Sequence, residues 1–361
     1  MKKRDDLPVL RTIYFYLTEG CNLRCRHCWL APRYDDKGRG RTLPVDLFQR
    51  AVREAKPLGL QSVKLTGGEP LLHPRFPRLL EILRQEDVGL AVETNGVLCT
   101  REIAEDLART HHPHVSVSID GADAETHEWM RGVAGCFEQS KEAVRHLVAA
   151  GIETEIIMSL TRRNADQIED VVHMAEALGA SSVKFNIIQP TARGEALIRE
   201  GESLPVEELI RFVQYTEEVM AGRTDLDLYF DYPNAFRPMS RIARQGCSEC
   251  EILNIVGVLS DGSYALCGIG HQIGELVFGT VGQDGLDTLW AETPVLKALR
   301  AGLPRRLEGV CSRCILRKSC RGRCIAQNYY SGRSLWAPFW FCHEAYQKGL
   351  FPESRLCDIL E

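Results

Sequence analysis

The sequence lacks long apolar runs, an apolar segment at its start and an excess of basic residues. Its longest apolar stretches, 155–160 and 182–188, are far shorter than the roughly 20 residues of a membrane-spanning helix. The first ten residues, MKKRDDLPVL, contain no signal-peptide core, so we expect a cytoplasmic protein without membrane contact. With 44 Lys and Arg against 49 Asp and Glu and a net charge of -5, nucleic acid is not an expected partner.

Cysteine, by contrast, is abundant. The chain has 14 cysteines in 361 residues, and a protein of this size with 44% hydrophobic residues does not need disulfides to hold its core. In a reducing compartment, so many thiols indicate metal binding. Three cysteines lie within residues 21–28 and nine lie within 247–357, so two cysteine-rich ends flank a cysteine-poor body.

Between these ends, short apolar runs alternate with longer segments of helical period. Such a pattern predicts a parallel sheet that is covered by helices and binds its ligands at the carboxyl ends of the strands. Six strand-and-helix units predict an α/β fold with a partial (β/α)6 TIM-like barrel rather than a closed barrel of eight. The expected strands are residues 12–17, 62–66, 90–94, 114–119, 154–160 and 182–188, and the expected helices are 44–58, 76–85, 101–110, 137–150 and 166–178.

The remainder of the chain has a different composition. Residues 189–205 are rich in Gly, Pro, Glu and Arg, and a helix at 206–220 and a strand at 228–232 are expected to follow. From residue 245 onward, short runs and paired cysteines carry too little apolar periodicity for a separate core, so this part should need metal to fold. We therefore predict a barrel at 1–190, a bridging region at 191–244 and a cysteine-rich domain at 245–361.

The first cysteine cluster directly follows the first expected strand. Cys21, Cys25 and Cys28 lie in a loop that should open at the carboxyl edge of the sheet. Structural zinc sites and iron-sulfur cubanes normally have four protein ligands, so three thiolates leave one metal position free for another ligand. A zinc site completed by His27 is the alternative, which the specific spacing of the cysteines disfavours.

The segment Cys21-Asn-Leu-Arg-Cys25-Arg-His-Cys28 resembles the CxxxCxxC loop of radical S-adenosylmethionine (SAM) enzymes. Members of that family have a partial (β/α)6 barrel. The resemblance implies a [4Fe-4S] cluster whose free iron chelates the amine and carboxylate of SAM. It also implies reductive cleavage of SAM to a 5'-deoxyadenosyl radical, which abstracts hydrogen from a substrate carbon.

Further motifs match this family in the same order along the chain. The run Gly67-Gly68-Glu69-Pro70 resembles the GGEP element at the methionine amine, although alone it would also suit a turn. Later strand ends and the segment 127–132 resemble the parts that hold the methionyl, ribose, carboxylate and adenine groups, although such polar residues can also cap strands. The resemblance implies that SAM contacts Gly67, Gly68, Glu69, Asn95, Ser118, Arg131 and Asn186.

Eight cysteines near the C-terminus resemble the SPASM domain of peptide-modifying radical enzymes. The resemblance implies two auxiliary [4Fe-4S] clusters, and therefore three clusters in total. Zinc is the alternative metal, because paired cysteines serve both metals. Cys99, Cys136 and Cys357 are left over and are expected to be buried thiols. The implied ligands are Cys247, Cys250, Cys267 and Cys324 for the first auxiliary cluster, and Cys311, Cys314, Cys320 and Cys342 for the second.

These motifs specify a radical reaction but not its product. The resemblance implies modification of a ribosomally made precursor peptide. Gly268 stands where sulfatase maturases have an acidic residue, which argues against that branch, and the CWLAP segment resembles maturases that cross-link side chains. We therefore expect a carbon–carbon or thioether cross-link within the peptide. A tetrapyrrole- or heme-modifying enzyme, oxidation like that of sulfatase maturases and a non-catalytic iron-sulfur protein are the alternatives.

Two protein partners are expected besides the precursor peptide. Reduction of the radical cluster requires an electron donor such as flavodoxin or ferredoxin. About ten residues precede the first expected strand, which leaves no room for a leader-binding domain at that end. The precursor should therefore be recognised by the barrel or by a separate leader-binding protein.

Overall fold

The structure is a computed structural model that describes residues 7–35, 37–246 and 250–357. One predicted cluster ligand, Cys247, lies outside these residues. The described strands form one sheet in the order β10-β9-β8-β1-β2-β3-β4-β5-β6-β7. They are β1 (Thr12–Tyr16), β2 (Ser62–Thr66), β3 (Gly89–Thr94), β4 (His111–Ser118), β5 (Glu153–Leu160), β6 (Ser182–Ile187), β7 (Asp227–Phe230), β8 (Ile255–Val258), β9 (Ser263–Ala265) and β10 (Val277–Thr280).

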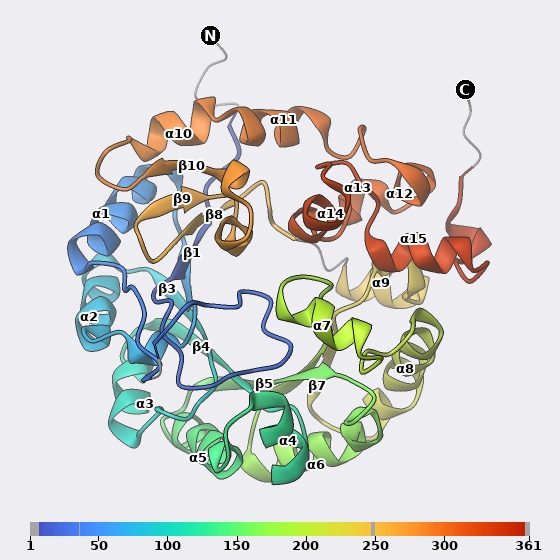
Figure 1. Ribbon diagram of the computed structural model, residues 1–361, viewed down its shortest axis with the longest axis horizontal. Helices are drawn as coiled ribbons and strands as arrows, with labels where there is room; N and C mark the ends of the chain where they lie inside the picture. Colours follow the sequence, from blue (N-terminus) through green and yellow to red (C-terminus); the bar gives the residue numbers. More distant parts are fainter. Residues whose placement is uncertain (1–6, 36, 247–249, 358–361) are drawn as a thin grey trace.

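The middle of this sheet is the predicted partial barrel. Strands β1 to β6 are parallel and adjacent in chain order, and all six expected strands are present. β7 extends the parallel sheet beyond β6, and β8 pairs in parallel with β1 at the other end. β9 and β10 continue from β8 as antiparallel strands. Figure 1 shows the sheet curved around the centre of the molecule with helices outside it.

The barrel helices bury the apolar faces that the sequence predicted. In α1 (Val45–Ala55), the buried residues Phe48, Ala51, Val52 and Ala55 follow helical spacing and face the sheet. Two further helices, α4 (Ala124–Arg131) and α7 (Arg193–Arg199), were not predicted. The other helices that accompany strands β2 to β6 are α2 (Phe76–Glu86), α3 (Arg101–Ala108), α4 (Ala124–Arg131), α5 (Cys136–Ala149), α6 (Ile168–Leu178) and α7 (Arg193–Arg199).

The C-terminal part contains more helix than expected. The predicted helix and strand of the bridging region are present as α8 and β7, but the helices after residue 285 were not predicted. These helices are short, so none of them repeats an apolar period often enough to stand out in the sequence. The helices from residue 206 onward, of which only α8 was predicted, are α8 (Val206–Glu218), α9 (Met239–Gln245), α10 (Leu286–Glu292), α11 (Pro294–Gly302), α12 (Gly309–Arg313), α13 (Arg317–Cys320), α14 (Ile325–Gly332) and α15 (Trp340–Gln347).

The barrel and the C-terminal part share one hydrophobic core. Buried side chains from β1 through α15 belong to a single contiguous cluster, to which Phe15, Phe185 and Phe341 all contribute. Short 3-10 turns connect several elements. No helix in the described ranges is long and apolar enough to cross a bilayer. The turns are η2 (Lys56–Leu58), η3 (Pro70–Leu72), η4 (Ala165–Gln167), η5 (Met220–Gly222), η6 (Asn234–Phe236), η7 (Gly268–His271), η8 (Gly274–Leu276) and η9 (Glu353–Arg355).

Candidate active site

The loop between β1 and α1 carries the first cysteine cluster and is fastened to the loop after β2. The backbone N–H of Gly68 donates to the carbonyl of Thr18 at 2.6 Å, and that of Glu69 donates to the carbonyl of Gly20 at 2.8 Å. A Cβ atom added at Gly68 would lie 1.9 Å from the Gly20 oxygen. The glycine pair is therefore required by the close approach of two backbones beside Cys21.

The three cysteines of the loop line one cavity at the carboxyl edge of the sheet. The cavity gathers nine of the ten residues that the sequence assigned to the radical cluster and to SAM. The exception is Asn186, which lies on β6 and does not line this cavity, and whose buried Oδ1 atom has no hydrogen-bond partner among the described residues. The nine are Cys21, Cys25, Cys28, Gly67, Gly68, Glu69, Asn95, Ser118 and Arg131.

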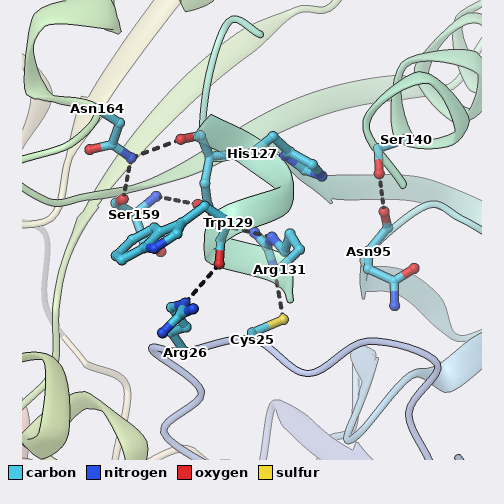
Figure 2. Close-up of polar contacts among 10 residues, drawn as sticks. Cys25, Arg26, Asn95, His127, Trp129, Arg131, Ser140, Ser159 and Asn164 are labelled. Carbon is cyan, nitrogen blue, oxygen red and sulfur yellow. Dashed lines mark hydrogen bonds and ion pairs between the residues drawn. The ribbon is translucent and has the colours of Figure 1, made fainter. Parts of the chain in front are cut away.

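Glu69 and Asn95 connect the end of β3 to the cysteine loop. The buried Glu69 carboxylate accepts hydrogen bonds from Thr94 Oγ1 at 2.7 Å and from the backbone N–H of Asn95 at 2.9 Å. Burial raises the pKa of Glu69 above its ordinary value. Asn95 Nδ2 then donates to Asn22 Oδ1 at 2.8 Å. The Asn95 carbonyl accepts from Ser140 Oγ at 2.7 Å, as Figure 2 shows. The Glu69 side chain therefore holds the wall of the cavity in place.

Arg131 lies at the end of α4, beside Cys25. Its guanidinium pairs with the buried carboxylate of Asp120, with 2.8 Å between Nε and Oδ2, and its Nη1 donates to Cys25 Sγ at 3.6 Å (Figure 2). Burial alone would raise the pKa of Asp120, but Arg131 brings it below its ordinary value. The carbonyl of Arg131 also accepts from the backbone N–H of Arg24 at 2.9 Å. This buried pair fixes a positive charge next to a cysteine thiol.

Several residues of this cavity were not predicted from the sequence. Glu93 and Thr66, at the ends of β3 and β2, line it together with Tyr34 and Arg193. Glu93 pairs with Lys64 of β2 at 2.7 Å. Glu93 could have been found from the sequence, because a charged residue within an otherwise apolar strand must either point into the barrel or be paired.

The C-terminal cysteines fall into two groups. Cys250 and Cys324 line a common cavity, and Cys267 is close enough to raise the pKa of the Cys250 thiol, although burial is the larger cause. The other group, around a second, smaller cavity, consists of Cys311, Cys314, Cys320 and Cys342.

These groups do not resemble single-ion sites. Among the described His, Cys, Asp and Glu side chains, no three are arranged to hold one metal ion. Each ligand of a cubane binds a different iron, whereas the ligands of zinc converge on one point. The chemistry and grouping of the described thiols suit cubanes.

The three remaining cysteines have different surroundings. Cys99 and Cys136 are buried, as expected, with exposed fractions of 5% and 1%. The expectation was wrong for Cys357, which is only partly buried. Its thiol donates to the carbonyl of Arg313 at 3.0 Å and accepts from Arg317 Nη1 at 3.3 Å.

Comparison with known proteins identifies the family. The model of the "Radical SAM superfamily" matches residues 15–175. The chain is 30% identical over 335 residues to the AdoMet-dependent heme synthase of Methanosarcina barkeri, covering 88% of this chain and 92% of that protein. It is 28% identical over 356 residues to the mycofactocin maturase MftC of Mycobacterium ulcerans, covering 97% and 92%.

Solved structures agree in fold. SuiB of Streptococcus suis bound to its precursor peptide SuiA has a TM-score of 0.72 at 19% identity, covering 94% of this chain and 77% of that one. The anSMEcpe structure with AdoMet and the Cp18Cys peptide has a TM-score of 0.71 at 18% identity, covering 94% and 98%. The chain therefore belongs to the radical SAM superfamily, and it is an enzyme of the type that uses SAM and a [4Fe-4S] cluster.

Proposed function

We propose that this enzyme cross-links side chains within a ribosomally made precursor peptide. The observation that carries the proposal is the pair of cysteine groups packed on the barrel, because this arrangement resembles the SPASM domain of peptide-modifying enzymes. A relative named a mycofactocin maturase matches over 97% of the chain, and SuiB, which has a similar fold, was solved with a precursor peptide. The corresponding division into parts is a barrel at 1–190, a bridge at 191–244 and a SPASM domain at 245–361.

In this proposal, Cys21, Cys25 and Cys28 hold the radical cluster, which supplies the electron for SAM cleavage when bound. Their thiols lie at one cavity, and the Arg131 guanidinium beside Cys25 would stabilise thiolate charge. The SAM contacts would come from Gly67, Gly68, Glu69, Asn95, Ser118, Arg131 and Asn186. Asn186 does not line the cavity. Its Oδ1 atom, which has no partner among the described residues, would suit a part of SAM that extends beyond the cavity.

The C-terminal groups would hold two auxiliary [4Fe-4S] clusters. We assign Cys250, Cys267 and Cys324, together with Cys247, to the first, and Cys311, Cys314, Cys320 and Cys342 to the second. The observed grouping of the described cysteines supports this interleaved order. Flavodoxin or ferredoxin would supply electrons, and a separate leader-binding protein could present the precursor.

The auxiliary assignment predicts the iron content of the protein. Anaerobic reconstitution should load about twelve iron atoms, four in each of three cubanes. Because Cys320 and Cys324 would serve different clusters, either Cys→Ala change should lower iron content, solubility and product formation together. SAM cleavage without product can survive in both variants. Iron content that is unchanged in Cys320→Ala and Cys324→Ala alike would refute the two-cluster assignment.

The function is tested by the mass of the product. A short precursor peptide that is rich in Cys, Trp or other aromatic residues, encoded beside the gene, is co-expressed with the enzyme. Each cross-link replaces two bonds to hydrogen by one new bond: one hydrogen atom would pass to the 5'-deoxyadenosyl radical, and the other would leave as a proton while an auxiliary cluster would accept the remaining electron. The peptide should therefore lose about 2 Da. The Cys21→Ala enzyme serves as the control and should leave the mass unchanged. An unchanged mass with deuterium uptake at an alpha carbon would instead indicate epimerisation and would contradict cross-linking.

A tetrapyrrole substrate is the second candidate. The supporting observation is the 30% identity to a relative named AdoMet-dependent heme synthase, which extends over 88% of this chain. Assays of the same reconstituted enzyme with a porphyrinoid and with the co-encoded peptide distinguish the two candidates. Turnover of a porphyrinoid, with no mass change in any co-encoded peptide, would replace the peptide proposal.

A further inference from the structure

The cavity that Cys250 and Cys324 line lies inside the barrel, on the side where the C-terminal part packs. It is larger than the cavity of the first cysteine cluster. It measures about 610 Å³ and thus has the size of a typical ligand site. Residues from β1, β4, β5, β6 and β7 line it, and so do the thiols of Cys250 and Cys324. The cavity therefore adjoins the first auxiliary cysteine group.

Most charged side chains in and around this cavity have a partner. Lys64 pairs with Glu93 at 2.7 Å, and Lys64 also lies 4.8 Å from the centre of the Tyr14 ring. Glu155 accepts a hydrogen bond from Ser116 Oγ at 2.9 Å. Two arginines that line the cavity also have carboxylate partners: Arg323 pairs with Asp231, and Arg237 pairs with Glu217.

Lys184 is different. It lies on β6, lines the cavity and forms no ion pair or hydrogen bond with any side chain in the described parts of the chain. The carboxylates of Glu93 and Glu155 are near enough to influence its charge, but neither lies within ion-pair distance. Burial lowers the pKa of Lys184 below its ordinary value. An ammonium group held in a partly closed cavity without a partner costs free energy unless a ligand supplies one.

Paired side chains connect the two cavities. Glu93 lines the cavity of the first cysteine cluster and pairs with Lys64, which lies over the ring of Tyr14, and Tyr14 lines the cavity of Lys184. Aromatic rings surround the same space, including those of Phe230 and Phe339. Among the cations of the lining, Lys184 is thus the one without an ion pair in the described parts of the chain; it lies beside aromatic surface, and the carboxylates of Glu153 and Glu155 line the same cavity.

We propose that Lys184 binds a carboxylate of the substrate and so fixes the part of the substrate that lies between the SAM cavity and the first auxiliary cysteine group. This inference rests on the proposed function, because it takes the cavity to be the substrate site. An ammonium forms charge-assisted hydrogen bonds with a carboxylate, and the aromatic lining suits an apolar group next to it. In a peptide, the carboxylate belongs either to an acidic side chain or to the C-terminus.

Binding of small probes to the reconstituted enzyme, measured by anaerobic calorimetry with SAM present, tests this inference without turnover. N-acetylphenylalanine carries a C-terminal carboxylate, and N-acetylphenylalaninamide is its neutral match. N-acetylaspartylphenylalaninamide carries the carboxylate on a side chain. At least one of the two acids should bind about tenfold more tightly than the neutral amide, and the acid that does so identifies the source.

Variants of Lys184 test whether this residue causes the preference for the acid over the amide. Lys184→Met keeps the length of the side chain but removes its charge, and it should bind acid and amide about equally. Lys184→Arg should retain most of the preference. The control is Lys297→Met, which removes an exposed lysine paired with Glu292 and should bind as the wild type does. Unchanged iron content in all variants verifies that the fold is intact.

Two outcomes would overturn the inference: no preference for either acid in the wild type, or the same preference in Lys184→Met. Because no reaction is measured, these outcomes differ from a failure of the proposed function. That failure would appear as an unchanged peptide mass, whatever Lys184 binds.

Discussion

Replacing Cys21, Cys25 and Cys28 together by alanine is expected to abolish the formation of 5'-deoxyadenosine and to remove about a third of the bound iron. The three thiols lie on one loop and line one cavity, so they would share a single cluster. Without a thiolate ligand set, neither electron transfer to SAM nor chelation of its methionyl group is possible. Anaerobic reconstitution, an iron assay and chromatography of the nucleoside products measure both effects.

The matched control replaces a cysteine that lies outside every proposed cluster. Cys99 is buried in the core, and burial with the nearby Glu69 charge raises the pKa of its thiol to about 12, so it stays protonated. Cys99→Ala should keep its full iron content and its SAM cleavage. A triple variant that still produces 5'-deoxyadenosine would contradict the assignment of the radical cluster.

The barrel could be predicted because its elements carry strong local patterns. Strands that are covered on both faces carry apolar runs, such as Ile156 to Met158 in β5, where the 7 residues from Thr154 to Leu160 are all buried. Helices such as α6 repeat buried residues at helical spacing, including Val171, Ala175 and Leu178. Each signal lies within one segment, so no knowledge of the rest of the fold is needed to recognise it.

The missed features depend on partners that are far apart in the sequence. Helix α4 is short and buries His127 and Arg131 beside Met130, so it has no apolar period. The buried guanidinium of Arg131 pairs with Asp120 and donates to Cys25, which is far away in the sequence and lies beside it in Figure 2. The resemblance to SPASM domains implied which C-terminal thiols group together, but only the fold shows which charges inside the barrel are paired.

Replacing Gly68 by alanine is expected to displace the cysteine loop and to reduce SAM cleavage at least tenfold. The added methyl group would lie 1.9 Å from the carbonyl oxygen of Gly20, and both partners are backbone, so no side chain can rotate away. Separating the two loops also breaks the hydrogen bonds from Gly68 to Thr18 and from Glu69 to Gly20. Cys21 directly follows Gly20, so displacing Gly20 also moves a proposed cluster ligand.

The clash should also destabilise the folded protein by about 1–3 kcal/mol, the usual cost of forcing an extra group into a packed region. Gly222→Ala is the matched control, because no heavy atom lies within 4 Å of its added Cβ, and it should change stability by less than about 0.5 kcal/mol. Anaerobic denaturation of the reconstituted enzymes and calorimetry with SAM measure stability and binding separately. If Gly68→Ala matched Gly222→Ala in both stability and SAM binding, the two loops would be able to separate freely. The inference that the cysteine loop is rigidly attached to the loop after β2 would then be wrong.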